Sequence, residues 1–477
     1  MRLKRKSLFL CFWIVLLFAI PSVGQKKGPI IFKGGETVSF IGNSITHSGG
    51  FHNHILLYYA TRFPNEEIVF LNAGISGDNA NDIFRRLDDD IIPLNADWSI
   101  VMVGMNDVNR ALYAPKRVGE GGLEEQKQIA IQNFRNHLNR MLSKLSQTGT
   151  KIVLQTPSIY DQTAQLSSEN YFGVNDALKE CAAIVEEMAR KYDTYLVDYW
   201  QFMTQTNEQL QQKDPTATII SIDRVHPWGT GDLIMAYRFL EETGVPSTVA
   251  ELEIKNGAVK KCINCKATVA KANKSTIEFQ VKAESLPFPL EDEPQTALAL
   301  ELVPFIDELN REILKLNKLK KGAYSLSIDD TLIGHFTDKA LADGVNLAQY
   351  RHTPQYQQAL EVRAIAVEYR KVQRQLRDIK LVQNRRFPVH LRNASIAEIA
   401  SFIATTLENL KDSEDRKYPE MEKIFDDYLK LKHQEEVMEA KLVELTASIY
   451  ETNRPAAHNY VVKRLSKNES RLLNNEK

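Results

Sequence analysis

The sequence predicts an α/β protein with a doubly wound parallel sheet, followed by a small β-rich module and a C-terminal helical region. Between residues 37 and 244, short apolar runs alternate with helix-length amphipathic stretches, which is typical of a parallel sheet covered on both faces. Alternating apolar and polar residues follow over 250–337, and a charged, helically periodic region follows over 338–477. We therefore expect the α/β domain at 30–246, then the β-rich module and the helical region with a frayed tail.

Composition excludes several classes of protein. The chain has 477 residues, of which 43% are hydrophobic and 25% charged, and this profile is that of an ordinary globular protein. Its 60 basic and 61 acidic residues give a formal net charge of −1. A nucleic-acid binder carries a basic excess, so we expect no nucleic-acid partner.

The N-terminus has the layout of a secretory signal peptide. Four basic residues lie within 2–6, an apolar run covers 8–20, and Ser22, Val23 and Gly24 follow Pro21. The run of 13 residues is too short to span a bilayer as a helix. We expect cleavage after Gly24, no stable membrane span afterwards, and a secreted or periplasmic protein.

Five short apolar runs are the expected strands of the first domain. Each is rich in β-branched residues and ends in Gly, Asn, Thr or Asp. Helix-length segments lie between them, such as 131–145, where Phe134, Leu138, Met141 and Leu145 recur at helical spacing. The runs are 38–41, 68–71, 99–103, 151–154 and 194–197.

The second half of the chain has a different pattern of apolar and polar residues. Residues 276–281 and 324–329 alternate as strands do, whereas 309–319 fit either a strand or a helix. From 358 to 450, apolar residues at helical spacing among mixed charges predict two or three long antiparallel helices, with a break at Pro388. We expect these helices to pack against the first domain, although an oligomerisation arm is the alternative.

The cysteines indicate little about the function. Cys11 leaves with the signal peptide, and Cys181, Cys262 and Cys265 remain. Cys262 and Cys265 have the spacing of half a zinc site, but no second pair of ligands lies near them in the sequence. We therefore expect a local disulfide or two buried thiols, and no metal.

Three predicted strands end in residues that suit a catalytic site. Ser44 follows the first strand within Gly-Asn-Ser-Ile-Thr, Gly77 follows the second, and Asn106 follows the third within Gly-Met-Asn-Asp. Ligands bind beyond the carboxyl ends of parallel strands, where these residues offer a hydroxyl, a backbone amide and a carboxamide. Taken alone, the segment around Ser44 is better explained as a Ser/Asn helix cap.

A fourth segment supplies a base. Asp223 lies three residues before His226, ahead of the last expected helix of the domain. At this spacing the carboxylate can reach Nδ1 of the imidazole and leave Nε2 free to accept a proton from Ser44.

Together, these segments resemble the four sequence blocks of the SGNH hydrolase (GDSL esterase/lipase) superfamily, in the family's order, over residues 36–244. The resemblance implies a flavodoxin-like serine hydrolase that needs no metal or other cofactor. Carried over position by position, Ser44 is the nucleophile and Asp223 and His226 complete the triad. The backbone amides of Ser44 and Gly77 and the side chain of Asn106 form the oxyanion hole.

A few residues depart from the family or stay ambiguous. Asn43 replaces the Asp of the first block; because that Asp is outside the triad, we expect activity to persist. His47 and His52 either line the pocket or are exposed or capping residues. The acidic residues 88–90 could form a metal site, but we expect them to lie on a solvated helix face.

The sequence therefore predicts an exported serine esterase. We expect its substrate to be a small-molecule or polysaccharide ester, with O-acyl, especially acetyl, groups on carbohydrates favoured. A lipase or lysophospholipase, or a non-catalytic surface protein that binds carbohydrate with the same fold, remains an alternative. Oligomeric state stays open.

Overall fold

The first domain is built on a five-stranded parallel sheet. In the computed structural model, which describes residues 29–392, 394–413, 415–466 and 468–469, the strand order is β2-β1-β3-β4-β5. The five expected runs all coincide with strands, with ends that differ by three residues at most. The strands are β1 (Thr37–Gly42), β2 (Val69–Gly74), β3 (Trp98–Met102), β4 (Lys151–Gln155) and β5 (Tyr195–Val197).

Helices cover both faces of this sheet, so it is doubly wound. Val38 and Phe40 of β1 face a core that includes α2 (Gly50–Arg62) and α7 (Thr230–Thr243). Ile41 faces a second core against other helices. Successive strand residues point to opposite faces, which explains why the apolar runs are continuous. The second core is lined by α3 (Ala80–Arg85), α4 (Leu123–Leu145) and α5 (Val174–Lys191), while α6 (Trp200–Gln211) follows β5.

The β-rich module consists of two sheets around a core of its own. The ambiguous segment 309–319 forms β10, whose residues alternate between exposed and buried. One sheet contains, in order, β13 (Val345–Asn346), β10 (Arg311–Asn317), β6 (Thr248–Lys255) and β7 (Ala258–Ile263). The other contains β12 (Thr331–Thr337), β11 (Ala323–Ile328), β14 (Ala457–Arg464), β9 (Thr276–Ala283) and β8 (Cys265–Ala272).

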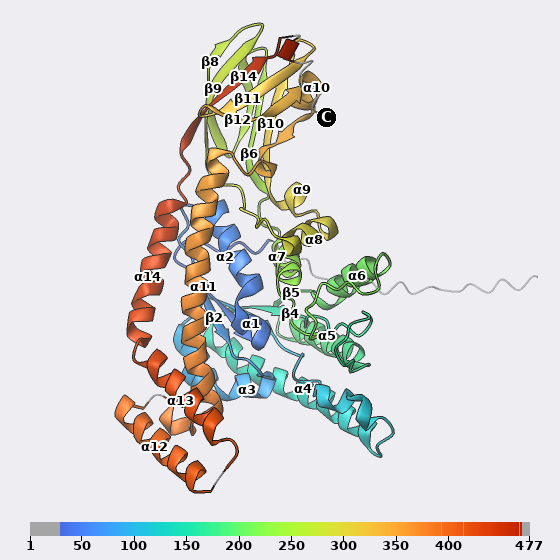
Figure 1. Ribbon diagram of the computed structural model, residues 1–477, viewed down its shortest axis with the longest axis vertical. Coiled ribbons are helices and arrows are strands. Elements are labelled where there is room, and N and C mark those ends of the chain that lie inside the picture. Colours follow the sequence, from blue (N-terminus) through green and yellow to red (C-terminus); the bar gives the residue numbers. More distant parts are fainter. Residues whose placement is uncertain (1–28, 393, 414, 467, 470–477) are drawn as a thin grey trace, which may run out of the picture.

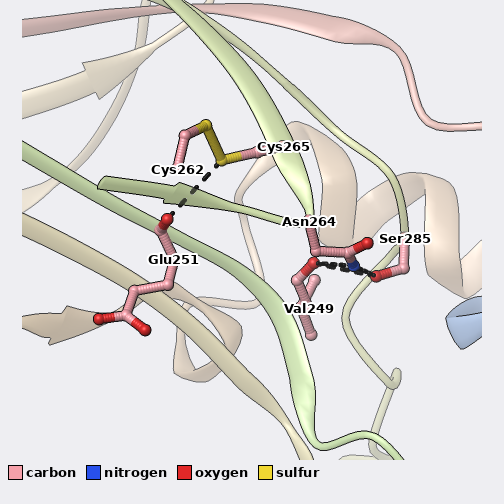
Figure 2. The surroundings of a disulfide bond; sticks show 6 residues. All are labelled: Val249, Glu251, Cys262, Asn264, Cys265 and Ser285. Carbon is pink, nitrogen blue, oxygen red and sulfur yellow. Dashed lines mark hydrogen bonds between the residues drawn. A yellow bond between two sulfur atoms is a disulfide. The ribbon is translucent and has the colours of Figure 1, made fainter. Parts of the chain in front are cut away.

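A disulfide joins Cys262 of β7 to Cys265 of β8, at the passage from one sheet to the other (Figure 2). Asn264, within this turn, has φ +55° and donates from Nδ2 to the Val249 carbonyl at 2.6 Å and to Ser285 Oγ at 2.7 Å. Of the alternatives open from the sequence, the local disulfide is present. Cys181 is a buried free thiol.

A 33-residue helix, α11 (Pro354–Arg386), runs from the β-rich module along the first domain (Figure 1). It ends two residues before Pro388, as predicted. Helix α14 (Glu435–Thr452) lies antiparallel to it, since Gln358 donates to the Thr452 carbonyl near one end and Lys380 lies 3.8 Å from Glu435 near the other. At the far end of the pair lie α12 (Ile396–Asp412) and α13 (Tyr418–Lys432).

Helix α11 packs directly against the first domain. Tyr369 donates its hydroxyl to the Phe70 carbonyl of β2 at 2.8 Å, and Gln373 donates to the same oxygen at 2.6 Å. Ala359, Val362 and Ala366 belong to the same apolar core as α2 and α7. The helical region therefore covers the sheet domain, as the sequence analysis expected.

The segment 457–464 differs from the expected helical region over 338–477. It forms β14, which pairs between β9 and β11 and completes the second sheet of the β-rich module. Tyr460 and Val462 are the buried residues of its alternating pattern. The structure describes nothing of 1–28, so the predicted signal peptide lies outside the described residues. In the described ranges, no helix has the length and apolar character needed to cross a membrane.

Candidate functional site

Ser44 is the first residue of a short helix, α1 (Ser44–Ser48), directly after β1. The preceding Asn43 is buried, and its Oδ1 accepts the backbone N–H of Ile45 at 3.1 Å. This bond caps the helix. The residue that departs from the family pattern therefore still fixes the turn that presents Ser44.

Ser44, His226 and Asp223 form a continuous hydrogen-bonded line. Nε2 of His226 lies 2.8 Å from Ser44 Oγ, and Nδ1 lies 2.5 Å from Asp223 Oδ2. Ser44 and His226 are 182 residues apart in the chain. A neutral histidine that donates from Nδ1 has Nε2 free to accept the serine proton.

The Asp223 carboxylate is held in place by several donors. Its Oδ1 accepts from the Ser221 hydroxyl at 2.6 Å and from the backbone amides of Val225 and His226 at 2.9 and 3.0 Å. Burial raises the pKa of Asp223, but the hydrogen bonds from Ser221, His226 and Val225 outweigh it and bring the pKa to about 2. Asp223 is therefore ionised at neutral pH and orients the imidazole.

Trp228 stacks on the ring of the histidine. The Trp228 and His226 rings stack with their centroids 5.2 Å apart and their planes 19° apart. Trp228 is 56% exposed, which is unusual for so large an aromatic residue. Only its position two residues after His226 distinguished it in the sequence.

Gly77 and Asn106 lie on the neighbouring loops that follow β2 and β3. Asn106 donates from Nδ2 to the Asp78 carbonyl at 2.8 Å, so the two loops meet next to Gly77. Gly77 has φ +83°, in the left-handed region that favours glycine. Because β1 lies between β2 and β3, these loops flank the turn that carries Ser44.

Asp107, the next residue, holds the same two loops together. Its Oδ1 accepts from Ala80 N at 2.8 Å and its Oδ2 from Gly104 N at 2.9 Å. Burial raises the pKa of Asp107 to about 7, although these backbone N–H groups favour the ionised form. Asp107 thus shapes the site and does not contact the triad.

A buried set of charges supports the loop after β2. Arg86, which is fully buried, donates from Nε to Asp78 at 2.7 Å and from Nη1 to Asp90 at 2.6 Å. From α11, Arg377 binds both oxygens of Asp90 at 2.8 and 2.6 Å, and Arg385 binds Asp78 at 2.7 Å. We name this set, Asp78, Arg86, Asp90, Arg377 and Arg385, the charge cluster.

The expected solvated face at 88–90 is wrong for Asp90, which belongs to the charge cluster, whereas Asp88 is exposed as expected. Asp90 is buried, and the adjacent guanidinium groups of Arg377 and Arg86 outweigh the effect of burial and hold its pKa well below the ordinary value. Asp88 pairs with Lys144 and Asp89 with Arg392. In the described part of the chain, no group of acidic, histidine or cysteine side chains is suited to hold a metal ion.

His47 and His52 are both buried, so the expectation that they are exposed is wrong. Nε2 of His52 bonds the Thr46 carbonyl in the last turn of α1 at 3.0 Å, so His52 caps that helix. His47 Nδ1 accepts the Ser76 N–H at 3.1 Å, and its Nε2 lies 3.1 Å from Asp378 of α11. His52 stacks on Phe40 with ring centroids 4.8 Å apart, and burial lowers its pKa to about 4. Both are therefore framework residues that link α1, α2 and α11 to the sheet.

The chain is similar to several known proteins. Residues 40–232 match the GDSL-like Lipase/Acylhydrolase family. An acetylxylan esterase of Geobacillus stearothermophilus is 26% identical over 227 residues, which are 44% of this chain and 94% of that protein. The solved structure of Axe2, an acetylxylan esterase of the same organism, is 24% identical, with a TM-score of 0.37 over 46% of this chain and 98% of that one.

Another solved structure is similar over nearly the whole length. A gut microbial diltiazem-metabolizing enzyme is 32% identical, with a TM-score of 0.82, and the similarity covers 92% of this chain and 100% of that one. The β-rich module and the helical region are thus part of a shared architecture. The N-terminal half of the chain belongs to the SGNH hydrolase superfamily, and the protein is a carboxylic-ester hydrolase.

Proposed function

We propose that Ser44, His226 and Asp223 are the catalytic triad of a serine esterase. The observation that carries this proposal is the hydrogen-bonded line from Ser44 Oγ through the imidazole to the Asp223 carboxylate. His226 removes the Ser44 proton while Oγ attacks the ester carbonyl, then donates that proton to the leaving alcohol. Water repeats the sequence on the acyl-enzyme, with His226 again as the base.

The tetrahedral oxyanion is stabilised by three donors, the backbone amides of Ser44 and Gly77 and the side-chain amide of Asn106. A carboxamide has two N–H groups. One N–H of Asn106 is bonded to the Asp78 carbonyl, which fixes the plane of the amide and leaves the second for the oxyanion. Fixed donors of this kind usually supply a large share of the rate enhancement.

The favoured substrates are acyl groups, especially acetyl, on carbohydrates. Two features support this choice: similarity to an acetylxylan esterase and the exposed Trp228 ring stacked beside His226. An exposed indole face suits the apolar face of a sugar ring. The basic residues and apolar run of the N-terminus support export, which brings the enzyme to extracellular polysaccharides.

Acyl specificity separates the candidate functions. The protein is assayed with p-nitrophenyl acetate, butyrate and octanoate, and with acetylated xylan beside chemically deacetylated xylan. A preference for acetate with release of acetate from the polymer supports the carbohydrate esterase. A preference for octanoate supports the lipase or lysophospholipase.

A serine-directed fluorophosphonate tests the non-catalytic alternative. The esterase reacts covalently: Ser44 Oγ displaces fluoride, and the peptide containing Ser44 gains the mass of the reagent less HF. A carbohydrate-binding protein without a working triad does not react and hydrolyses none of the esters, and this outcome would overturn the proposal.

A further inference from the structure

Arg110 is a charged side chain beside the triad that has no partner. It begins the 3₁₀ turn Arg110–Tyr113, three residues after Asp107. Its Nη1 is shielded from solvent and donates no hydrogen bond to any described residue. Among the residues that the structure describes, no carboxylate lies within salt-bridge distance and no carbonyl accepts from its guanidinium group.

The groups that act on Arg110 electrostatically accept no hydrogen bond from it. Burial lowers the pKa of Arg110, and the negative charge of Asp223 and the hydroxyls of Tyr160 and Tyr171 oppose this change. Both oxygens of Asp223 are already bonded to Ser221, Val225 and His226. The Tyr160 hydroxyl accepts the Tyr171 N–H at 2.8 Å. The guanidinium group is therefore attracted by the charge of Asp223, but it has no hydrogen-bond acceptor of its own.

Exposed apolar side chains are next in sequence to two of these groups. Phe172, which directly follows Tyr171, is 70% exposed, and Ile222, which directly precedes Asp223, is 65% exposed. Apolar surface of this kind loses water when a ligand covers it, and a hydrogen bond to a charged group gains strength where the effective dielectric constant is low. A charge without a hydrogen-bond partner, on loops that also expose apolar side chains, is typical of a ligand site.

We propose that Arg110 is the cation of a subsite beside the triad that binds a carboxylate carried by the ester substrate. The inference rests on the proposed function of the triad, and it narrows the substrate class to acyl esters of acidic compounds, such as acylated uronic acids. A guanidinium group presents paired N–H donors that match the two oxygens of a carboxylate. Arg110 is a specificity residue and takes no part in the proton transfers.

Matched esters test the subsite. We compare kcat/KM for 4-acetoxybenzoate and its neutral methyl ester, which place the charge on the alcohol side. We also compare p-nitrophenyl hydrogen succinate with p-nitrophenyl butyrate, which place it on the acyl side. Arg110→Gln is expected to lower kcat/KM for an anionic ester on one side by about tenfold or more, and for its neutral partner less than threefold.

Two further variants separate charge from structure. Arg110→Lys keeps the charge and is expected to retain part of the preference, and Arg117→Gln, which removes an arginine paired with Glu120 on the same loop, is expected to leave it unchanged. Raising NaCl from about 0.02 to 0.5 M should reduce the wild-type preference. Equal losses on anionic and neutral esters in Arg110→Gln, or no loss on either side, would overturn the proposal.

A binding measurement distinguishes failure of the subsite from failure of the triad assignment. Binding of 4-hydroxybenzoate and 4-hydroxybenzamide, measured by calorimetry, needs no hydrolysis. Tighter binding of the carboxylate that is lost in Arg110→Gln supports the subsite even where Ser44 is not the nucleophile. No preference for the carboxylate in the wild-type protein, either for this pair or for succinamate over succinamide on the acyl side, overturns the subsite even where the triad is correct.

Discussion

Arg385, near the end of α11, donates from Nη2 to Asp78 Oδ1 at 2.7 Å and from the same nitrogen to the Ser76 carbonyl at 3.2 Å. These two acceptors lie on either side of Gly77. The Asp78 carbonyl in turn accepts from Asn106. A helix about 300 residues away in sequence thus supports the loop that carries one proposed oxyanion donor and contacts another.

Arg385→Ala is therefore expected to lower the rate more than the stability. Asp78 keeps its bond to Arg86, and the Arg385 side chain is 32% exposed, so the free energy of unfolding should fall by only about 1 kcal/mol. We expect kcat on p-nitrophenyl acetate to fall by about threefold to thirtyfold. Steady-state kinetics beside urea unfolding tests this, with Arg386→Ala as the control. An unchanged kcat would contradict the role of α11.

Asn106→Ala tests the oxyanion hole. The loss of one such donor typically lowers kcat by about 10²–10³-fold, whereas the lost hydrogen bond to Asp78 lowers stability by about 1 kcal/mol. We expect KM for p-nitrophenyl acetate to change little, because the donor acts mainly in the transition state. A variant with normal kcat would remove Asn106 from the hole.

The proposed site residues could be predicted from the sequence because each lies in a short local motif, either directly after a strand or, for Asp223 and His226, just before α7. Ser44, Asn106 and the pair Asp223 and His226 are each marked by two or three neighbours. No neighbouring motif residues distinguish Arg110, Arg377 or Arg385 in the sequence. Their positions depend on how distant segments pack, so only the structure brings α11 to the loop after β2.

Glu312 gives a pH-dependent prediction. It is buried on β10, its Oε1 accepts from Gln355 at 2.7 Å, and its Oε2 has no partner among the described residues. Burial raises its pKa from 4.5 to about 7, while Gln355 and Arg62 oppose the change. The folded protein keeps this proton where the unfolded chain has lost it. The resulting stability is complete below about pH 4.5 and is lost as the pH rises through 7.

Glu312→Gln cannot ionise, so its stability relative to the wild type should increase between about pH 5 and pH 8. We expect a gain of about 1–3 kcal/mol at the higher pH. Urea unfolding at both pH values measures it, with the exposed Glu284→Gln as the control. A difference from wild type that is the same at both pH values would show that Glu312 ionises freely in the fold.

Removal of the disulfide should affect the β-rich module and spare catalysis. The bond closes a loop with a sequence separation of only 3, and short loops give little stabilisation, about 2 kcal/mol at most. The double variant Cys262→Ser, Cys265→Ser is expected to keep kcat/KM within about twofold and to unfold at lower urea. A tenfold loss of activity would instead show that the module supports the active site.

The fold could be predicted where patterning is local. The five parallel strands are buried on both faces, which makes each a continuous apolar run, and α11 shows its apolar stripe over many turns. Strand β14 could not be predicted, because eight residues of weak alternation gain their meaning from pairing with β9 and β11, more than 100 residues earlier. Segment 309–319 was ambiguous for the same reason.

Hydrolysis of p-nitrophenyl acetate by Ser44→Ala tests the central claim most directly. Ser48→Ala is the matched control, because Ser48 lies on the same short helix and its hydroxyl donates to the Ile45 carbonyl. The account predicts that turnover falls by more than about 10⁴-fold in Ser44→Ala and stays within about twofold of wild type in Ser48→Ala, with both variants folded. Turnover in Ser44→Ala within tenfold of wild type would contradict the account and show that another residue attacks the ester.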